Sequence, residues 1–368
     1  MLMTLLRDLD LGLSLPLRRL IATVTACLLD GTDAHLSDLA DALPDRESDQ
    51  MAKEQRLRRL LSHPGLSPQR FLPAYLHLLR PVLPRLPELV LSMDRTNWKK
   101  RTCHVNILMV SVHFHGRAIP LFWTVRDRAG NSGIADWKTV LGPVITAIQA
   151  DHELRDRPLV VTADREFASP QLAEWLMQRY QVASVLRLKR SEYLCDQAHE
   201  IKLADLLAFF PRGETRSYPR TTVTKTSPFL VNVTITWAAA YAEPLILMST
   251  LAGGPLSITT YQRRFGIEAM FKDQKSNGFN VEQTKVTDPK RIETLLILTT
   301  FAHIFCTTEG YRQEQQGEIK KNDTNEPSSA LADSFSSASP PSNKRFDGRA
   351  NGYSNNLSTV CQYLWHNH

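Results

Sequence analysis

The chain has 368 residues, 42% of them hydrophobic and 22% charged, which is typical of a soluble protein with a real core. Its net charge of +6 raises the expectation of a nucleic-acid partner only modestly, because many proteins without a polyanionic partner have similar values. Five scattered cysteines without CxxC spacing argue against structural zinc and for a reducing compartment. The most apolar C-terminal run, residues 292–306, is too short and too interrupted to span a bilayer, and the N-terminus lacks the pattern of a signal peptide.

Residues 1–85 are predicted to form a helical N-terminal region. Its run "QRLRRLLSH" predicts a basic helix, on which Arg56, Arg58 and Arg59 could bind phosphates at a DNA end. The same pattern fits an ordinary packed helical lid whose arginines are solvated. Both interpretations stay open at this point.

From residue 86 the period changes to that of a mixed α/β order, with helices covering a sheet. The predicted order over residues 86–191 is three strands, a helix, a strand, a helix and a strand. The predicted strands are 88–94, 104–114, 117–125, 157–164 and 182–189, and the helices are 136–151 and 169–180. A tight turn at "HGR" joins the second and third strands as a hairpin, and Ser169 with Pro170 predicts a helix start.

The remaining chain divides by composition into three parts. Residues 192–256 are rich in β-branched side chains and predict a β-rich insertion. Residues 257–310 hold a charged helix and then a long apolar helix that should be buried. Residues 311–368 are dominated by Ser, Asn, Gln, Pro and Gly, which predicts a disordered tail.

Two aspartates have equivalent places in this order. Asp94 and Asp164 each close a short apolar strand, and each is followed by Arg. Ligands and metals are usually bound at strand ends in α/β sheets. A single strand-terminal Asp, however, is most often only a turn or cap residue.

The stretch "YQRRFGIEAMFKDQK" places a carboxylate among cations on one helical face. At about 100° per residue, Tyr261, Arg264, Glu268 and Lys275 fall within about 60° of arc, and Lys272 lies on the same side. Alternatively, the charged face belongs to an ordinary surface helix, stabilised by i,i+4 charge pairs of about 0.2–0.5 kcal/mol each.

Two aspartates from strand ends and Glu268 from a helix would together suit divalent cations. Mg²⁺ or Mn²⁺ favours oxygen ligands and accepts phosphate oxygens in the rest of its shell. Two such ions about 3.5–4 Å apart promote phosphoryl transfer. The chain has no GxxxxGK[ST], HExxH or GxSxG motif, so nucleotide hydrolysis, zinc proteolysis and serine hydrolysis are not indicated.

These residues resemble a known family. The spacing Tyr-x2-Arg-x3-Glu-x6-Lys is similar to the signature of bacterial insertion-sequence-4 type DDE transposases, and "MDRTNW" and "TADREF" resemble its two aspartate blocks. The resemblance covers about residues 35–308. It implies an α/β, ribonuclease-H-like mixed sheet with a β-rich insertion. It also implies that Asp94, Asp164 and Glu268 are catalytic metal ligands for Mg²⁺, with Mn²⁺ as a substitute and two ions in the site.

The resemblance further implies that Tyr261, Arg264 and Lys275 contact DNA phosphates near the cut, and Lys272 is an additional candidate. The expected activity is Mg²⁺-dependent cleavage and joining of transposon-end DNA, that is, DNA transposition by recombination. The expected partners are terminal inverted repeats and target DNA, with a possible homodimer in the DNA complex and no membrane. The expected location is the bacterial cytoplasm, with nucleoid association when DNA is bound. The alternatives are a transposase-derived DNA-binding protein without catalysis and a metal-dependent nuclease that cuts without joining.

Overall fold

The computed structural model describes residues 2–9, 11–100, 103–127, 130, 132–195, 200–224, 227–238 and 242–317. Most of the tail expected to be disordered, residues 318–368, lies outside the described residues. The expected boundary at residue 310 falls inside the last helix, which continues to Gln315.

The N-terminal region is helical. Its elements are α1 (Leu2–Asp8), α2 (Leu15–Leu29), α3 (Leu36–Ala42), α4 (Gln50–Leu61), α5 (Pro68–Leu79) and the short turn η1 (Leu83–Arg85). Asp49 caps α4 by accepting from the Ala52 amide, and Ser67 caps α5 by accepting from the Arg70 amide. Arg56, Arg58 and Arg59 are exposed on α4, as both interpretations of this helix require.

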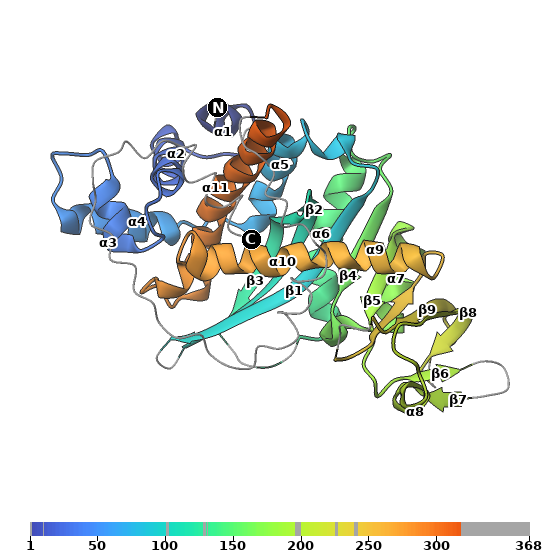
Figure 1. Ribbon diagram of the computed structural model, residues 1–368. Helices are drawn as coiled ribbons and strands as arrows, with labels where there is room; N and C mark the ends of the chain where they lie inside the picture. Colours follow the sequence, from blue (N-terminus) through green and yellow to red (C-terminus); the bar gives the residue numbers. More distant parts are fainter. Residues whose placement is uncertain are drawn as a thin grey trace.

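The central sheet contains ten strands among the described residues, in the order β3-β2-β1-β4-β5-β10-β9-β8-β6-β7 (Figure 1). Strands β1, β4 and β5 are parallel to one another, and the other pairings are antiparallel. The bounds are β1 (Leu89–Lys100), β2 (Cys103–Phe114), β3 (Arg117–Arg126), β4 (Leu159–Ala163), β5 (Ala183–Arg187), β6 (Tyr193–Cys195), β7 (Glu200–Lys202), β8 (Thr215–Val223), β9 (Val231–Thr236) and β10 (Leu245–Ser249). This mixed α/β architecture confirms the predicted fold class.

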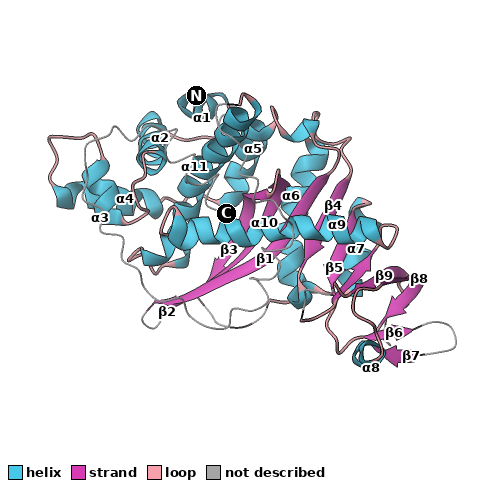
Figure 2. Ribbon diagram, viewed as in Figure 1, coloured by secondary structure: helices cyan, strands magenta, loops and turns pink. Residues whose placement is uncertain are grey.

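Helices cover both faces of the sheet (Figure 2). The helices α6 (Ile134–Ala150) and α7 (Pro170–Tyr180) lie on one face, whereas α9 (Pro255–Gln262) and α10 (Gly266–Lys272) cross the other. Ser169 caps α7 by accepting from the Leu172 amide, as predicted. None of the described helices is long and apolar enough to cross a membrane.

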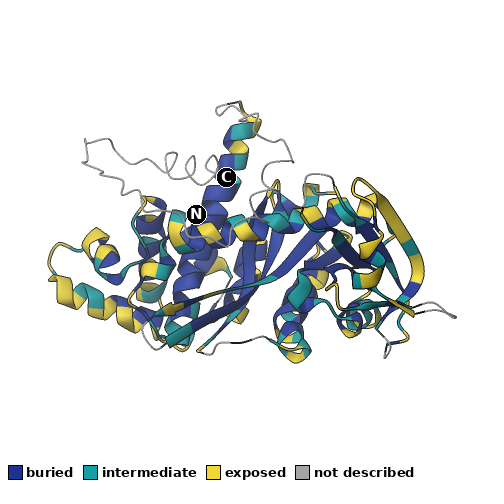
Figure 3. Ribbon diagram, turned by 60° about the horizontal axis from the view of Figure 1, so that its bottom comes forward, coloured by how far each residue is buried: buried dark blue, intermediate teal, exposed yellow. Residues whose placement is uncertain are grey.

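The long helix α11 (Pro289–Gln315) joins the sheet to the N-terminal helices. It contacts β3 on one side and α2, α4 and α5 on the other. Most of its length is buried (Figure 3). Phe301 packs edge-on against Phe71 and Tyr75 of α5. The prediction of a buried helix after the charged stretch is confirmed.

One sequence expectation about a strand needs correction. The strand expected to end at Asp94 continues to Lys100, because β2 pairs with β1 from Leu91 to Lys100. The β-rich insertion joins the central sheet, since β10 pairs with β5 and β9 pairs with β10. It also includes a short helix, α8 (Leu203–Ala208). Sequence periodicity predicts strands, but it does not reveal which strands pair.

The stretch from Tyr261 to Lys275 is not one regular α-helix, as the angular calculation assumed. After α9 the chain forms a 3₁₀ turn, η3 (Arg263–Phe265), then α10, and then a π-helical turn, η4 (Asp273–Asn277). These turns advance by angles other than 100° per residue. Lys275 therefore lies in a different direction from the one predicted.

Gly266 allows α10 to approach the sheet closely. A Cβ atom at this position would lie 2.8 Å from the carbonyl carbon and 2.9 Å from the carbonyl oxygen of Arg117 in β3. Any larger side chain would push α10 away from the sheet. The helix that carries Glu268 is thus held at a backbone-to-backbone contact two residues before that carboxylate.

Candidate active site

The sheet register places Asp94 and Asp164 side by side. Strands β1 and β4 are parallel, and their last paired residues are Met93 and Ala163. The next residue on each strand is an aspartate, and neighbouring strands lie about 4.8 Å apart. Asp94 is therefore at the end of the β1–β4 pairing, although β1 itself continues along β2.

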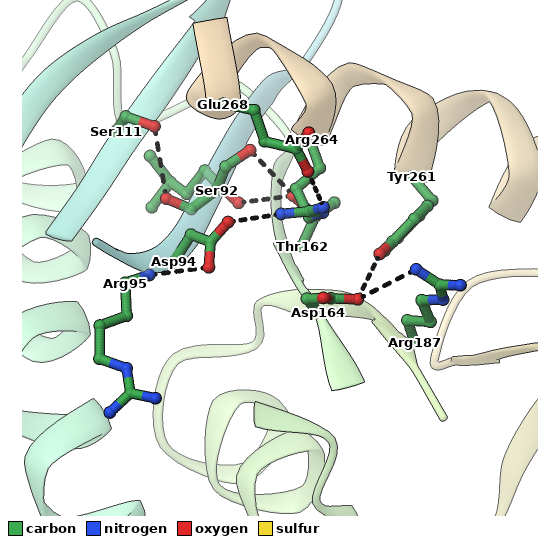
Figure 4. A network of polar contacts seen from close by, with 11 residues as sticks. Ser92, Asp94, Arg95, Ser111, Thr162, Asp164, Arg187, Tyr261, Arg264 and Glu268 are labelled. Atoms are coloured by element: carbon green, nitrogen blue, oxygen red, sulfur yellow. Dashed lines mark hydrogen bonds and ion pairs between the residues drawn. The ribbon is translucent and has the colours of Figure 1, made fainter. Parts of the chain in front are cut away.

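Strand alternation directs both aspartates to the face that α9 and α10 cross. Side chains two residues apart share a face, so Asp164 points the same way as Thr162 and Val160. Val160 packs with Tyr261 of α9, which identifies this face. Beneath the carboxylates the hydroxyls of Ser92 and Thr162 lie 3.0 Å apart and form a buried polar floor (Figure 4).

Arg264 lies between two of the three predicted metal ligands. Its guanidinium donates to Asp94 Oδ2 over 2.6 Å and to Glu268 Oε1 over 2.5 Å. The Arg264 side chain is only 3% exposed, whereas that of Glu268 is 43% exposed. This burial excludes the surface-helix interpretation, because a solvated i,i+4 pair would expose both partners.

Tyr261 and Arg187 surround Asp164 (Figure 4). The Tyr261 hydroxyl donates to Asp164 Oδ1 over 3.2 Å, and Arg187 Nη1 lies 3.5 Å from the same oxygen. Tyr261 and Arg187 are both buried. Sequence reasoning missed Arg187, although its place two residues after the buried Val185 in β5 was an available signal for this face.

Burial and neighbouring charges shift the acidity of these groups. Burial raises the pKa of Asp94 to about 6, against the opposing effect of Arg264, and the charges of Asp164 and Glu268 raise it further. Burial also opposes ionisation of Asp164, but Arg264, Arg187 and the hydrogen bonds outweigh it, so the pKa of Asp164 lies below its usual value. Burial opposes the charge of Arg264 as well, yet Tyr261 and the carboxylates raise its pKa, so the guanidinium stays charged.

The two lysines lie apart from this cluster. Lys275 Nζ donates to the carbonyl of Asn97 over 3.3 Å and lies 5.7 Å from the Trp98 ring centroid, both in the extension of β1. Lys272 is exposed. The structure therefore brings together Asp94, Asp164, Tyr261, Arg264 and Glu268, and it places Lys275 beside the extension of β1.

A polar cavity of about 360 Å³ opens beside the cluster. Two predicted ligands, Asp164 and Glu268, line it together with three arginines. Its lining residues are Asp164, Arg165, Arg187, Ala242, Glu243, Arg264, Phe265 and Glu268. Such a lining favours an anionic group that brings its own counter-ions.

The fit to divalent cations rests on donor chemistry. Across the described part of the chain, no group of three or more His, Cys, Asp or Glu side chains has the arrangement of a metal site. Nevertheless, the charges of Asp164 and Glu268 both raise the pKa of Asp94, so these carboxylates lie within electrostatic reach of it. A divalent cation would relieve the mutual repulsion of these three carboxylates. Mg²⁺ and Mn²⁺ prefer such oxygen donors. For all three to ligate, the guanidinium of Arg264 has to leave its present position.

Comparison with known proteins supports this interpretation. Residues 138–305 match the family model described as a transposase DDE domain. This segment of the chain is thus similar to a transposase DDE domain. The matched segment contains Asp164 and Glu268 and begins after Asp94. It supports a transposase function in general, and with it DNA binding. A search of curated proteins found no match.

Proposed function

We propose that this protein is an insertion-sequence-4 type transposase that cuts and joins transposon ends by metal-dependent phosphoryl transfer. The observation that carries the proposal is that Arg264 joins Asp94 to Glu268, while Asp164 follows the neighbouring strand at the end of the β1–β4 pairing. The family match supports the transposase class, and the signature spacing of the 261–275 stretch supports the subtype.

In the proposed reaction, Asp94, Asp164 and Glu268 would hold two Mg²⁺ ions, or Mn²⁺ in their place. When bound, the ions would supply activation of the attacking oxygen and stabilisation of the leaving oxygen. Arg264, once released from the carboxylates, and Tyr261 orient the scissile phosphate. Lys275, which lies beside the extension of β1, and the exposed Lys272 bind the DNA backbone beyond it.

The proposed partners are the terminal inverted repeats and the target DNA, with a homodimer in the DNA complex. We place the reaction in the bacterial cytoplasm, at the nucleoid. The chain would then divide into five segments. These are a DNA-end-binding region (1–85), the first part of the catalytic core (86–191), the insertion (192–256), the second part of the core (257–310) and a tail (311–368).

A cleavage assay on end-labelled DNA tests the proposal. The purified protein is incubated with DNA that carries the element's own terminal repeats, with Mg²⁺ or with EDTA. We expect specific end cleavage followed by joining, both lost in EDTA and in Glu268→Gln. Glu309→Gln, which removes the carboxylate of another helical Glu–Arg pair, should keep both activities. Binding without cleavage would favour the DNA-binding alternative, and cleavage without joining would favour a nuclease.

A further inference from the structure

An ion pair joins the two chain segments that follow the catalytic aspartates. Arg95 comes directly after Asp94, and Glu166 comes two residues after Asp164. Arg95 Nη2 and Glu166 Oε2 lie 2.8 Å apart, and the two side chains are only 13% and 22% exposed. We call this contact the Arg95–Glu166 bridge. Figure 4 shows the Arg95 side chain pointing away from the carboxylate cluster, so it does not take part in the cluster itself.

Both ends of the bridge are also tied to the connection between β3 and α6. Arg95 Nη1 donates to the carbonyl of Gly130, which also accepts from Asn106 Nδ2 over 3.1 Å. Glu166 Oε1 accepts from the amide and the hydroxyl of Ser132 over 3.4 and 3.3 Å. The Ser132 hydroxyl in turn accepts from the Trp137 indole over 2.9 Å. The bridge is therefore one part of a network rather than an isolated surface contact.

Arg95 and Glu166 are each within two residues of one of the two aspartates along the chain. The amide of Arg95 donates to Asp94 Oδ1 over 2.7 Å, so the position of the Arg95 peptide sets the orientation of that carboxylate. Glu166 belongs to the turn η2 (Arg165–Phe167), whose last amide donates to the carbonyl of Asp164 over 2.9 Å. A displacement at either end of the bridge would thus move one aspartate relative to the other.

We propose that Arg95 and Glu166 are positioning residues that fix the spacing of Asp94 and Asp164 for divalent-cation binding. This inference rests on the proposed function, because it assigns the two aspartates to the metal. Arg95 and Glu166 touch neither metal nor DNA in this proposal. Their effect passes through the aspartates, as it does for residues that orient the ligands of other metal sites.

The test measures Mn²⁺ binding to the full chain by electron paramagnetic resonance, which counts free Mn²⁺, alongside the kinetics of end cleavage. The variants are Arg95→Gln, Glu166→Gln and the double variant. Arg80→Gln and Glu88→Gln are matched controls, since their ion pairs with Asp151 and Arg263 lie outside the bridge and its network. We expect each bridge variant to bind Mn²⁺ about 10- to 100-fold more weakly and to lose kcat to a similar degree. The KM for DNA should change little, because no phosphate contact is removed.

The double variant should be no weaker than the worse single one, because both changes break the same contact. Unchanged Mn²⁺ binding in the bridge variants, or an equal loss in the controls, would overturn the inference. If wild type binds Mn²⁺ and cuts DNA, and Glu268→Gln abolishes cutting while the bridge variants do not impair binding, only the bridge inference fails. If wild type neither binds Mn²⁺ nor cuts, the proposed function fails and the inference fails with it. Melting temperatures of all variants show whether a loss follows general unfolding.

Discussion

Removal of the Arg264 guanidinium should destabilise the metal-free protein and make it more dependent on metal. Arg264 holds Asp94 and Glu268 through two short charge-assisted hydrogen bonds, and its own side chain is almost fully buried. In Arg264→Gln, Asp94 would remain a largely buried carboxylate without its counter-charge. Breaking a buried pair in this way costs about 3–5 kcal/mol. The exposed Glu268 adds little, because solvent screens it.

We therefore expect the free energy of unfolding of Arg264→Gln to fall by about 3 kcal/mol in EDTA at pH 8. In this variant no guanidinium competes with Mg²⁺ for the carboxylates, so the affinity of the site for Mg²⁺ should rise. A tenfold tighter site adds about 1.4 kcal/mol of stabilisation at saturating metal. Saturating Mg²⁺ should consequently return part of the lost stability, and it should stabilise the variant more than it stabilises wild type.

Urea unfolding followed by circular dichroism, in EDTA and in a Mg²⁺ series, measures both effects. Arg263→Gln is the matched control, because Arg263 belongs to the same turn but makes a more exposed pair with Glu88. The control should lose less than about 1 kcal/mol and keep the metal response of wild type. The reasoning is refuted if Arg264→Gln is as stable as wild type in EDTA, or if Mg²⁺ stabilises it less.

Three further predictions concern the packing, the pH dependence and the DNA contacts of the same core. Gly266→Ala should cost about 1–3 kcal/mol in thermal unfolding and should slow end cleavage, because its Cβ would collide with the backbone of Arg117. Burial lowers the pKa of His113 to about 4, helped by the charge of Arg263, so stability should be full above pH 6.5 and should fall as the pH drops toward 4. At about 1.4 kcal/mol per pH unit, this loss is at most about 3 kcal/mol, and it should shrink in His113→Gln. Lys275→Gln should leave the melting temperature nearly unchanged but weaken DNA binding and reduce its salt dependence by about one phosphate contact.

Each of these predictions has a result that would contradict it. A fully stable and active Gly266→Ala would mean that α10 can move away from β3 without consequence. If His113→Gln loses as much stability at low pH as wild type, the loss comes from other groups. One such group is the buried His303, whose pKa burial also lowers. A salt dependence of DNA binding in Lys275→Gln equal to that of wild type would remove this lysine from the DNA contacts.

The apolar strand residues that precede Asp94 and Asp164, and the charged helical stretch, could be predicted because the relevant information is local. Period-2 alternation predicts the face of Asp164, and a short apolar run predicts the buried strand before it. The register that places Asp94 beside Asp164 is not local, since it depends on the pairing of β1 with β4. Arg187 became part of the site for the same reason, through the parallel pairing of β5 with β4.

Changes of helix type were also beyond the sequence pattern. A regular 100° step gives a fair position for Arg264 relative to Glu268, because they are one α-helical spacing apart and form the expected i,i+4 pair. It fails for Lys275, because Lys275 lies within the π-helical turn η4, where it contacts Trp98. Tertiary contacts such as the close approach at Gly266 decide where a helix tightens or widens.

The pairing of β10 with β5 has a consequence for how the length of this protein can vary. Because β10 is built into the central sheet, deleting the whole segment from β6 to β10 would expose the unpaired edge of β5, a row of free backbone groups beside buried apolar side chains. Trimming between β6 and β8 would leave the inner pairings intact. Shortened versions of the chain should therefore stay monodisperse only while β10 is retained. Light scattering of two deletions, one between β6 and β8 and one that also removes β10, would test this.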